Sequence, residues 1–154
     1  MAPHSTALGH ARYASLRTFR LDGTWVETPI WFAREEDHLY VRTGLMTAKV
    51  KRIRQTPGVE LRPSDYKGRY DTATMPSLGK AIICDPVEQR HGESLLKARY
   101  GWQWNIIPMI PLRGLSNPHP ELTIRERIEW ARSTDPWPGT CVLRIDLLDK
   151  EAAQ

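Results

Sequence analysis

YASLRTFRLDGTWVETPIWF, residues 13–32, decides the fold, because it carries the pattern of a β-hairpin. Two runs of strand-forming residues, 13–21 and 24–32, flank the dipeptide Asp22-Gly23. Asp-Gly between two such runs is one of the strongest short-range turn signals, since Gly accepts a positive φ without steric cost. Pro29 has no N–H to donate to a strand ladder, so the second strand is expected at a sheet edge or a bulge.

The residues after this hairpin continue the β pattern with one helix inserted. We expect a turn at Glu36-Asp37, a strand over 38–43, a half-buried strand over 59–62, and a longer strand over 70–84 interrupted at 75–77. The helix is predicted to begin at an N-cap, Thr47, and to end at the segment 55–58, which contains Pro-Gly. Its buried stripe is predicted to comprise Met46, Val50 and Ile53.

A second helix is predicted over 85–101, followed by a stretch of different character. Asp85 is the expected N-cap, Pro86 occupies the first turn, Glu88 completes a capping box and Gly101 ends the helix. The apolar face is predicted to be formed by Val87, His91, Leu95 and Ala98, with His91 as a packed core histidine. Residues 101–120 are rich in Trp, Ile and Pro, helical spacing returns over 122–132, and a last strand is expected over 139–148.

These elements predict a mainly β fold. About six strands and two or three short helices do not alternate regularly, so a doubly wound parallel sheet is not expected and a small barrel with helical inserts is. The 154 residues fit one domain, 1–154, with a flexible segment 1–11 and an insert at 101–137. That insert is either a lid over a pocket or dimer packing, and its apolar side chains favour packing.

The composition is that of an ordinary globular protein. No apolar run reaches the ~20 residues of a membrane span, and the first residues lack the layout of a secretory signal, so we expect a cytoplasmic protein. Cys84 and Cys141 each lie in a short apolar run and are expected to be reduced core residues. The five histidines are scattered, and no metal site is expected.

The basic character of the chain is local. The formal net charge is +4, yet residues 42–69 contain eight Lys or Arg and two acidic residues. On the helix that begins at Thr47, the uncovered N–H groups of the first turn, the Thr47 hydroxyl, the small Ala48 and the Lys49 ammonium would form a compact anion site. Arg52 lies one turn further along, and Arg42 and Thr43 end the preceding strand, so a single phosphate suits this arrangement.

Two alternatives to a phosphate site stay open at this point. In the first, Lys49, Lys51, Arg52 and Arg54 form only the solvated face of an amphipathic helix. In the second they contact nucleic acid, although the aromatic residues that could stack on bases lie far along the chain. Common catalytic and nucleotide-binding motifs are absent, and no pair of carboxylates has acid–base spacing. An enzyme with this sequence would therefore take its reactive group from a cofactor.

Three motifs together resemble one known family. TFRLDGTWVETPIWF, LYVRT and TAKVKRIRQTPGVEL are similar to the split β-barrel flavin/deazaflavin oxidoreductases, the pyridoxamine-5′-phosphate-oxidase-like proteins, and especially to their coenzyme F-420-dependent branch. The resemblance runs from Tyr13 to Leu61 and more loosely to Cys84. It implies a six-stranded split barrel that forms a homodimer with two cofactor sites at the subunit interface.

The resemblance also implies roles for individual residues. The cofactor phosphate would be held by Thr47, Ala48 and Lys49, with Lys51 and Arg52 as helpers and with Arg42 and Thr43 at its border. The backbone of Thr28 and Pro29 would lie along the ring system. Three positions depart from the family pattern: Trp25 replaces a small residue or proline, Ala48 replaces a frequent glycine, and Gly58 replaces an arginine.

The function implied is an oxidoreductase in which reduced coenzyme F-420 transfers a hydride to a small organic acceptor. The anionic polyglutamate tail of coenzyme F-420 also suits the local positive charge. The alternative is an FMN-binding oxidoreductase or flavin-holding protein, and a third possibility is a non-enzymatic binder of anions or nucleic acid. No residue is nominated as catalytic; Trp31, Trp102 and Trp104 are candidate pocket walls that are more often core residues.

Overall fold

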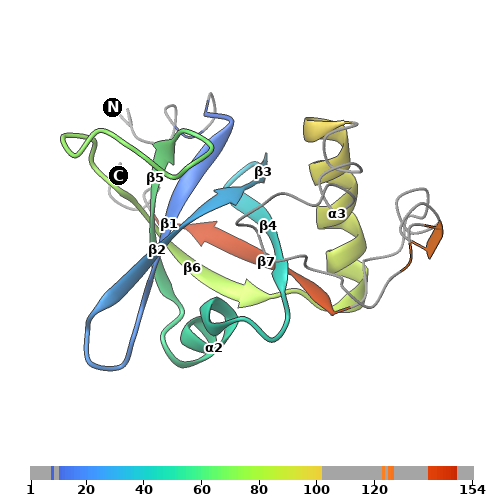
Figure 1. Ribbon diagram of the computed structural model, residues 1–154, viewed down its shortest axis with the longest axis horizontal. Helices are drawn as coiled ribbons and strands as arrows, with labels where there is room; N and C mark the ends of the chain where they lie inside the picture. Colours follow the sequence, from blue (N-terminus) through green and yellow to red (C-terminus); the bar gives the residue numbers. More distant parts are fainter. Residues whose placement is uncertain (1–7, 9–10, 102–122, 124, 127–138, 149–154) are drawn as a thin grey trace.

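A computed structural model describes residues 8, 11–101, 123, 125–126 and 139–148 of the chain. Seven strands form one curled antiparallel sheet in the order β2-β1-β5-β6-β7-β4-β3, and Figure 1 shows it bent into a half-barrel with α2 at one end and α3 outside. The strands are β1 Tyr13–Phe19, β2 Trp25–Trp31, β3 Ala33–Glu35, β4 His38–Gly44, β5 Gly58–Ser64, β6 Ser77–Ile83 and β7 Thr140–Leu147, and the helices are α2 Ala48–Gln55 and α3 Pro86–Tyr100. The predicted mainly β class is confirmed.

The hairpin β1–β2 forms as predicted. Its register runs from Tyr13↔Trp31 to Phe19↔Trp25, and Gly23 adopts a φ of 88° in the turn. The Asp22 carboxylate accepts hydrogen bonds from the Thr24 backbone N–H (2.9 Å) and hydroxyl (2.6 Å). β2 is an edge strand of the described sheet, which is where a proline residue is tolerated.

The expected strand count of six was too low, because the second run of the hairpin stretch breaks in two. The break lies at Phe32, between β2 and β3. The Tyr100 hydroxyl, at the end of α3, lies 2.8 Å from both the backbone N and the carbonyl oxygen of Phe32. A side chain from a distant helix thus occupies the backbone groups that would otherwise continue the ladder. β3 then turns through Glu36, whose φ is 54°, into β4.

Helix α2 begins at the predicted N-cap. The Thr47 hydroxyl accepts from the Val50 N–H (3.4 Å), and Val50 and Ile53 pack into the main core. The prediction that Met46 joins this buried stripe was wrong: Met46 precedes the N-cap, so it is not on the helix, and it is 93% exposed.

The strand predicted from residue 70 begins only at Ser77. Residues 70–76 form turns instead, with the Asp71 carboxylate accepting from the Ala73 N–H and its carbonyl from the Thr74 N–H, both at 2.9 Å. Short side-chain acceptors of this kind compete with strand ladders.

Helix α3 has the predicted caps but a different buried face. Asp85 accepts from the Glu88 N–H (2.8 Å), and Gly101 closes the helix with a φ of 58°. The predicted apolar face was wrong at three of its four positions: Val87 is 77% exposed, and His91 and Ala98 are exposed, so His91 is not a core histidine. Leu95 does pack against two core clusters, as predicted. The buried residues are Gly92, Glu93, Leu96 and Tyr100.

Gly92 explains the shift of this face. A Cβ at position 92 would lie 2.8 Å from side-chain atoms of both Tyr40 on β4 and Val142 on β7. Because Gly92 has no side chain, the helix lies close to the outer face of the sheet. This close packing buries the neighbouring residue Glu93. A pattern of apolar residues counts neither Gly nor Glu as a core residue, so it predicted that the neighbouring face of the helix is buried.

The remaining expectations concern the cysteines, membrane spans, metal sites and the segments outside the described residues. Cys84 and Cys141 are buried and free, as predicted, and burial raises the pKa of the Cys84 thiol to about 12. No helix within the described ranges is long and apolar enough to span a membrane, and no group of metal-ligating side chains forms there. Most of the predicted helix 122–132, most of the insert 101–137 and most of the segment 1–11, with Trp102 and Trp104, lie outside the described residues.

Candidate cofactor-binding site

Helix α2 presents its basic side chains on two flanks of its buried stripe. Val50 and Ile53 face the core, Lys49 and Arg52 lie to one side of them, and Lys51 is exposed on the other side. The N-cap hydroxyl of Thr47 is already engaged twice, because it donates to the Gly44 carbonyl (2.9 Å) while it accepts from the helix. Thr47 therefore shapes the start of α2, and ligand contacts there fall first to backbone N–H groups and to Lys49.

Lys49 is a partly buried cation. Burial, followed by repulsion from Arg52, lowers the pKa of the Lys49 ammonium to about 8. Burial also lowers the pKa of Arg52, with a further contribution from Arg20. Three positive groups thus converge between α2 and the end of β1, where each disfavours the charge of the next.

The end of the β1–β2 hairpin contributes two residues that sequence reasoning missed. Thr18, on the core-facing side of β1, accepts a hydrogen bond from Arg52 Nε at 2.7 Å. Arg20 lies just beyond the strand, and its Nη1 donates to the Thr24 hydroxyl (3.1 Å). No local signal marks either residue, because only the closure of the sheet brings this hairpin end next to α2 (Figure 1).

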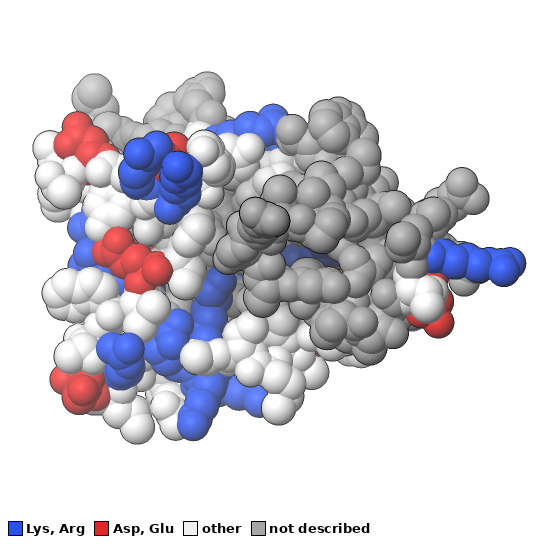
Figure 2. Space-filling view, viewed as in Figure 1, with Lys and Arg blue, Asp and Glu red and all other residues white. Residues whose placement is uncertain are grey.

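The opposite flank of α2 borders a groove of about 530 Å³. Its walls are formed by the loop before α2 and by the outward residues of the helix: Leu45, Met46, Thr47, Ala48, Val50, Lys51, Arg54 and Gln55. Figure 2 shows Lys and Arg side chains gathered over α2 and the adjacent part of the sheet. One phosphate cannot contact both flanks equally, so the predicted set Thr47, Ala48, Lys49, Lys51 and Arg52 divides between two surfaces.

The charges of α2 have no carboxylate partner among the described residues. Within the described ranges, none of its four basic side chains forms a salt bridge, whereas Arg17, Arg62, Arg69 and Arg144 each lie within 4 Å of a carboxylate: 2.5 Å for Arg17–Glu27, 3.8 Å for Arg62–Glu60, 2.7 Å for Arg69–Asp65 and 2.6 Å for Arg144–Glu88. A group of uncompensated cations, one of them partly buried, is a site where an anion is stabilising.

Arg42 and Thr43, both predicted at the phosphate border, point to opposite faces of β4. Thr43 shares the inner face with Val41 and lies next to the start of α2. Arg42 points to the outer face, where its Nη1 lies 3.6 Å from Glu93 of α3, and burial lowers its pKa. The structure therefore brings Thr43 to the helix start and directs Arg42 toward α3.

Thr28 and Pro29 also lie on different faces of β2. Thr28 pairs with Leu16, so its side chain points to the core side, and its buried hydroxyl has no hydrogen-bond partner among the described residues. Thr18 is its diagonal neighbour on that face. Pro29 points to the outer face. Trp31, a candidate pocket wall, packs instead between Tyr13 and Tyr100, with ring centroids 5.4 and 4.6 Å away.

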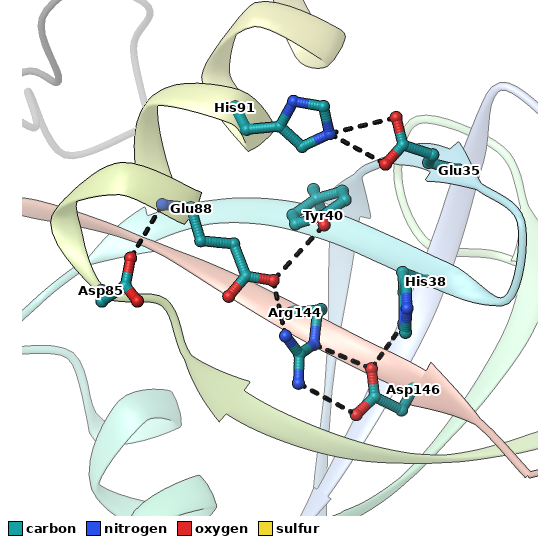
Figure 3. Close-up of polar contacts among 8 residues, drawn as sticks. All are labelled: Glu35, His38, Tyr40, Asp85, Glu88, His91, Arg144 and Asp146. Carbon is teal, nitrogen blue, oxygen red and sulfur yellow. Dashed lines mark hydrogen bonds and ion pairs between the residues drawn. The ribbon is translucent and has the colours of Figure 1, made fainter.

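A second polar cluster lies on the outer face of the sheet and serves a different purpose. Figure 3 shows Arg144 of β7 between Glu88 of α3 (2.6 Å) and Asp146 (2.9 Å). His91 Nε2 lies 2.8 Å from Glu35 on β3, and His38 Nδ1 lies 2.7 Å from Asp146. Arg144 is paired with two carboxylates and both imidazoles face carboxylates, so this cluster fastens α3 to the sheet rather than offering an anion site.

The chemistry of the α2 site fits a phosphate-bearing cofactor. It offers helix N–H groups, the Lys49 ammonium and the Arg52 guanidinium at one end, and along the inner face of the hairpin the Thr28 hydroxyl, which no described residue binds. Thr18 connects them, because it accepts from Arg52 and is the diagonal neighbour of Thr28 on the inner face. A molecule with a phosphate at one end and a planar ring at the other matches that order of groups.

Solved structures share the architecture over nearly the whole chain. A pyridoxamine 5′-phosphate oxidase-related, FMN-binding protein from Nostoc punctiforme is 21% identical, with a TM-score of 0.52, and the match covers 96% of this chain and 76% of that one. The chain has the split β-barrel fold. This split barrel, with seven strands in its described part, is the architecture that the resemblance implied, with one strand more than expected.

Other split barrels with this architecture differ in what they bind. An F-420 reductase is 17% identical with a TM-score of 0.50, covering 94% of this chain and 93% of that one. The heme storage protein of Vibrio cholerae is 9% identical with a TM-score of 0.59, covering 93% and 86%. Identities this low show the shared fold alone. No protein-family model and no curated protein matches the sequence.

Proposed function

We propose that this protein is an oxidoreductase that binds a flavin-type cofactor with its phosphate at the start of α2. The observation that carries the proposal is the cation pair Lys49 and Arg52, which no carboxylate of the described chain neutralises. A partly buried ammonium without an anion costs stability, so its presence requires a gain elsewhere, and ligand binding supplies that gain. The neighbouring structures named for FMN and F-420 support the same class of ligand.

The chain's own residues would bind, orient and shield the cofactor. Lys49, Arg52 and the first N–H groups of α2 hold the phosphate, Thr18 fixes the Arg52 guanidinium, and the Thr28–Pro29 segment borders the ring. Bound coenzyme F-420 or FMN supplies the redox chemistry by accepting or donating a hydride at its ring. The protein contributes position and a site from which water is largely excluded.

Coenzyme F-420 is the proposed cofactor, and the acceptor of its hydride is a small organic molecule. The three family-like motifs favour this branch, and the second flank of α2, with Lys51 and Arg54, adds positive charge that the anionic tail of coenzyme F-420 would neutralise. FMN is the alternative, because its single phosphate is already matched by Lys49 and Arg52. A homodimer with the cofactor at the interface is proposed from the resemblance.

Equilibrium titration with both cofactors tests this proposal. Protein from a host that lacks coenzyme F-420 should be colourless if it prefers that cofactor and yellow if it retains FMN. Lys49→Ala should weaken cofactor binding by on the order of 1.5–3 kcal/mol, the loss of a charged partner in a partly buried site. In the FMN titration Lys51→Ala is the matched control, since it removes the same charge from the exposed flank, which a single phosphate at Lys49 does not reach, and it should change the affinity severalfold less.

Two results would contradict the proposal. Absence of binding to either cofactor would remove the oxidoreductase assignment. Binding to nucleic acid that falls steeply with salt, together with no affinity for either cofactor, would favour the non-enzymatic binder instead.

A further inference from the structure

The loop between β5 and β6 is seated on one segment of the edge strand β2. Gly68, with a φ of 83°, packs against Pro29 so closely that a Cβ at position 68 would lie 3.3 Å from the Pro29 Cβ. The positive φ favours glycine at this position, and any side chain there would also press on Pro29. The loop thus contacts, on the outer face of β2, one of the two residues whose backbone the resemblance places along the cofactor ring.

One carboxylate holds the loop in this shape. Asp65 Oδ1 accepts from the backbone N–H groups of Lys67 and Arg69, both at 2.9 Å, and Oδ2 accepts from Arg69 Nε at 2.7 Å. The Asp65 carbonyl accepts from the Gly68 N–H at 3.0 Å. These hydrogen bonds, led by that of the Arg69 backbone, hold the pKa of Asp65 below its usual value, so the loop keeps this shape at neutral pH.

Tyr70, in the same loop, binds β2 at the residue on the other side of Thr28 in the chain. The Tyr70 hydroxyl lies 2.7 and 2.9 Å from the two carboxylate oxygens of Glu27. Arg17 lies 2.5 Å from the same carboxylate and 3.4 Å from the Tyr70 hydroxyl, and the Arg62 guanidinium lies 5.0 Å above the Tyr70 ring. Glu27 is therefore fixed from more than one side.

Gly68 and Tyr70 together contact the two residues that flank Thr28 in the chain, Pro29 and Glu27. Both contacts are on the outer face of β2, whereas the Thr28 side chain points to the inner face. β2 is an edge strand, so within the described sheet β1 alone fixes it through backbone hydrogen bonds. The loop therefore supports β2 on its outer face, in addition to the pairing with β1.

We propose that Gly68 and Tyr70 are positioning residues that set the depth of the segment Glu27–Pro29 and thereby its contact with the cofactor ring. This inference rests on the proposed function and assigns the phosphate and the ring of the cofactor to different elements of the fold. Helix α2 determines how tightly the phosphate is held, and the loop 65–70 determines how the ring is held. The two determinants lie on different elements and are separable by mutation.

Tyr70→Phe tests this division, because it removes the hydroxyl that binds Glu27 and keeps the ring under Arg62. Titrations with FMN and coenzyme F-420 should show binding weakened about two- to tenfold, as for the loss of one charge-assisted hydrogen bond in the supporting structure. The absorption band of the bound ring should move toward that of the free cofactor. The affinity for inorganic phosphate, measured by competition, should stay unchanged. Tyr66→Phe, in the same loop but exposed, is the control and should leave all three quantities unaltered.

Gly68→Ala provides a second, independent perturbation that should produce the same split between ring and phosphate. Equal losses for the ring-bearing cofactors and for inorganic phosphate would overturn the positioning role, as would wild-type cofactor affinity and an unshifted band in both variants. Those failures leave the proposed function standing. Wild-type protein that binds neither cofactor would remove both.

Discussion

Arg52 of α2 and Thr18 of β1 are joined by a hydrogen bond of 2.7 Å from Nε to Oγ1. They are 34 residues apart in the chain, and this contact closes the corner between the helix and the hairpin. It orients the guanidinium beside Lys49, so that two positive groups face one corner without a carboxylate between them. The proposed phosphate site is a consequence of that closure.

The partly buried Lys49 should trade stability for binding. Lys49→Met keeps the length of the side chain and removes an ammonium that burial and Arg52 both disfavour, so the free energy of unfolding of the ligand-free protein should rise by about 1–2 kcal/mol. The same change should weaken cofactor binding at least tenfold. Chemical denaturation and cofactor titration measure the two effects. A variant that loses both stability and binding would mark Lys49 as a structural residue.

Cofactor affinity should depend on pH through Lys49. With a pKa of about 8, the ammonium loses its proton above pH 8, and an anion that binds beside it must restore that proton. Affinity should therefore fall as pH rises from 8 to 10, by at most about tenfold per unit. Calorimetric titrations at pH 8.5 in two buffers of different ionisation enthalpy should reveal proton uptake, and Lys49→Met should abolish it. Affinity that is flat across this range in wild-type protein would contradict the assignment.

Through Lys49, the free energy of unfolding should rise over the same pH range in which cofactor affinity falls. Lysine in the unfolded chain keeps its proton up to its ordinary pKa of 10.5, whereas folded Lys49 loses it near 8. The unfolded state then binds more protons, so the contribution of Lys49 to the unfolding free energy rises with pH between these values. The difference between wild type and Lys49→Met, followed by denaturation from pH 7 to 10, isolates this contribution. A difference that does not shrink toward pH 10 would refute it.

The Thr18 hydroxyl should affect both stability and cofactor binding, because it accepts the hydrogen bond from Arg52. Thr18→Val removes the acceptor at nearly constant shape, so it should lower the free energy of unfolding by about 1 kcal/mol and weaken phosphate-dependent binding severalfold. Thr18→Ser keeps the acceptor and should restore most of the binding. If valine and serine behave alike in cofactor titrations, the orientation of Arg52 does not determine affinity.

Gly92 should tolerate no side chain. Gly92→Ala places a Cβ 2.8 Å from atoms of Tyr40 and Val142, and the resulting displacement of α3 should cost about 1–3 kcal/mol of stability. Gly58→Ala is the control, because a Cβ there meets nothing within 4 Å, and it should change the midpoint of unfolding little. Equal midpoints for the two variants would show that α3 does not pack on the sheet as described.

Local signals predicted much of the fold correctly. Asp22-Gly23 placed the first hairpin, Thr47 and Asp85 placed the starts of α2 and α3, and Pro29 placed β2 at an edge. Turn and cap preferences act between residues a few positions apart, so their physical causes are contained in the sequence itself. The concentration of positive charge in residues 42–69 is likewise a property of the sequence alone.

Tertiary structure decided the remainder, because it depends on which surfaces meet. The break at Phe32 needs the Tyr100 hydroxyl, and the buried face of α3 needs the space that Gly92 leaves beside Tyr40. The addition of Thr18 and Arg20 to one flank of α2 follows from the closure of the sheet, and the contact of Arg42 with Glu93 follows from the packing of α3 on the outer face. Such contacts join residues far apart in the chain, and no local pattern encodes them.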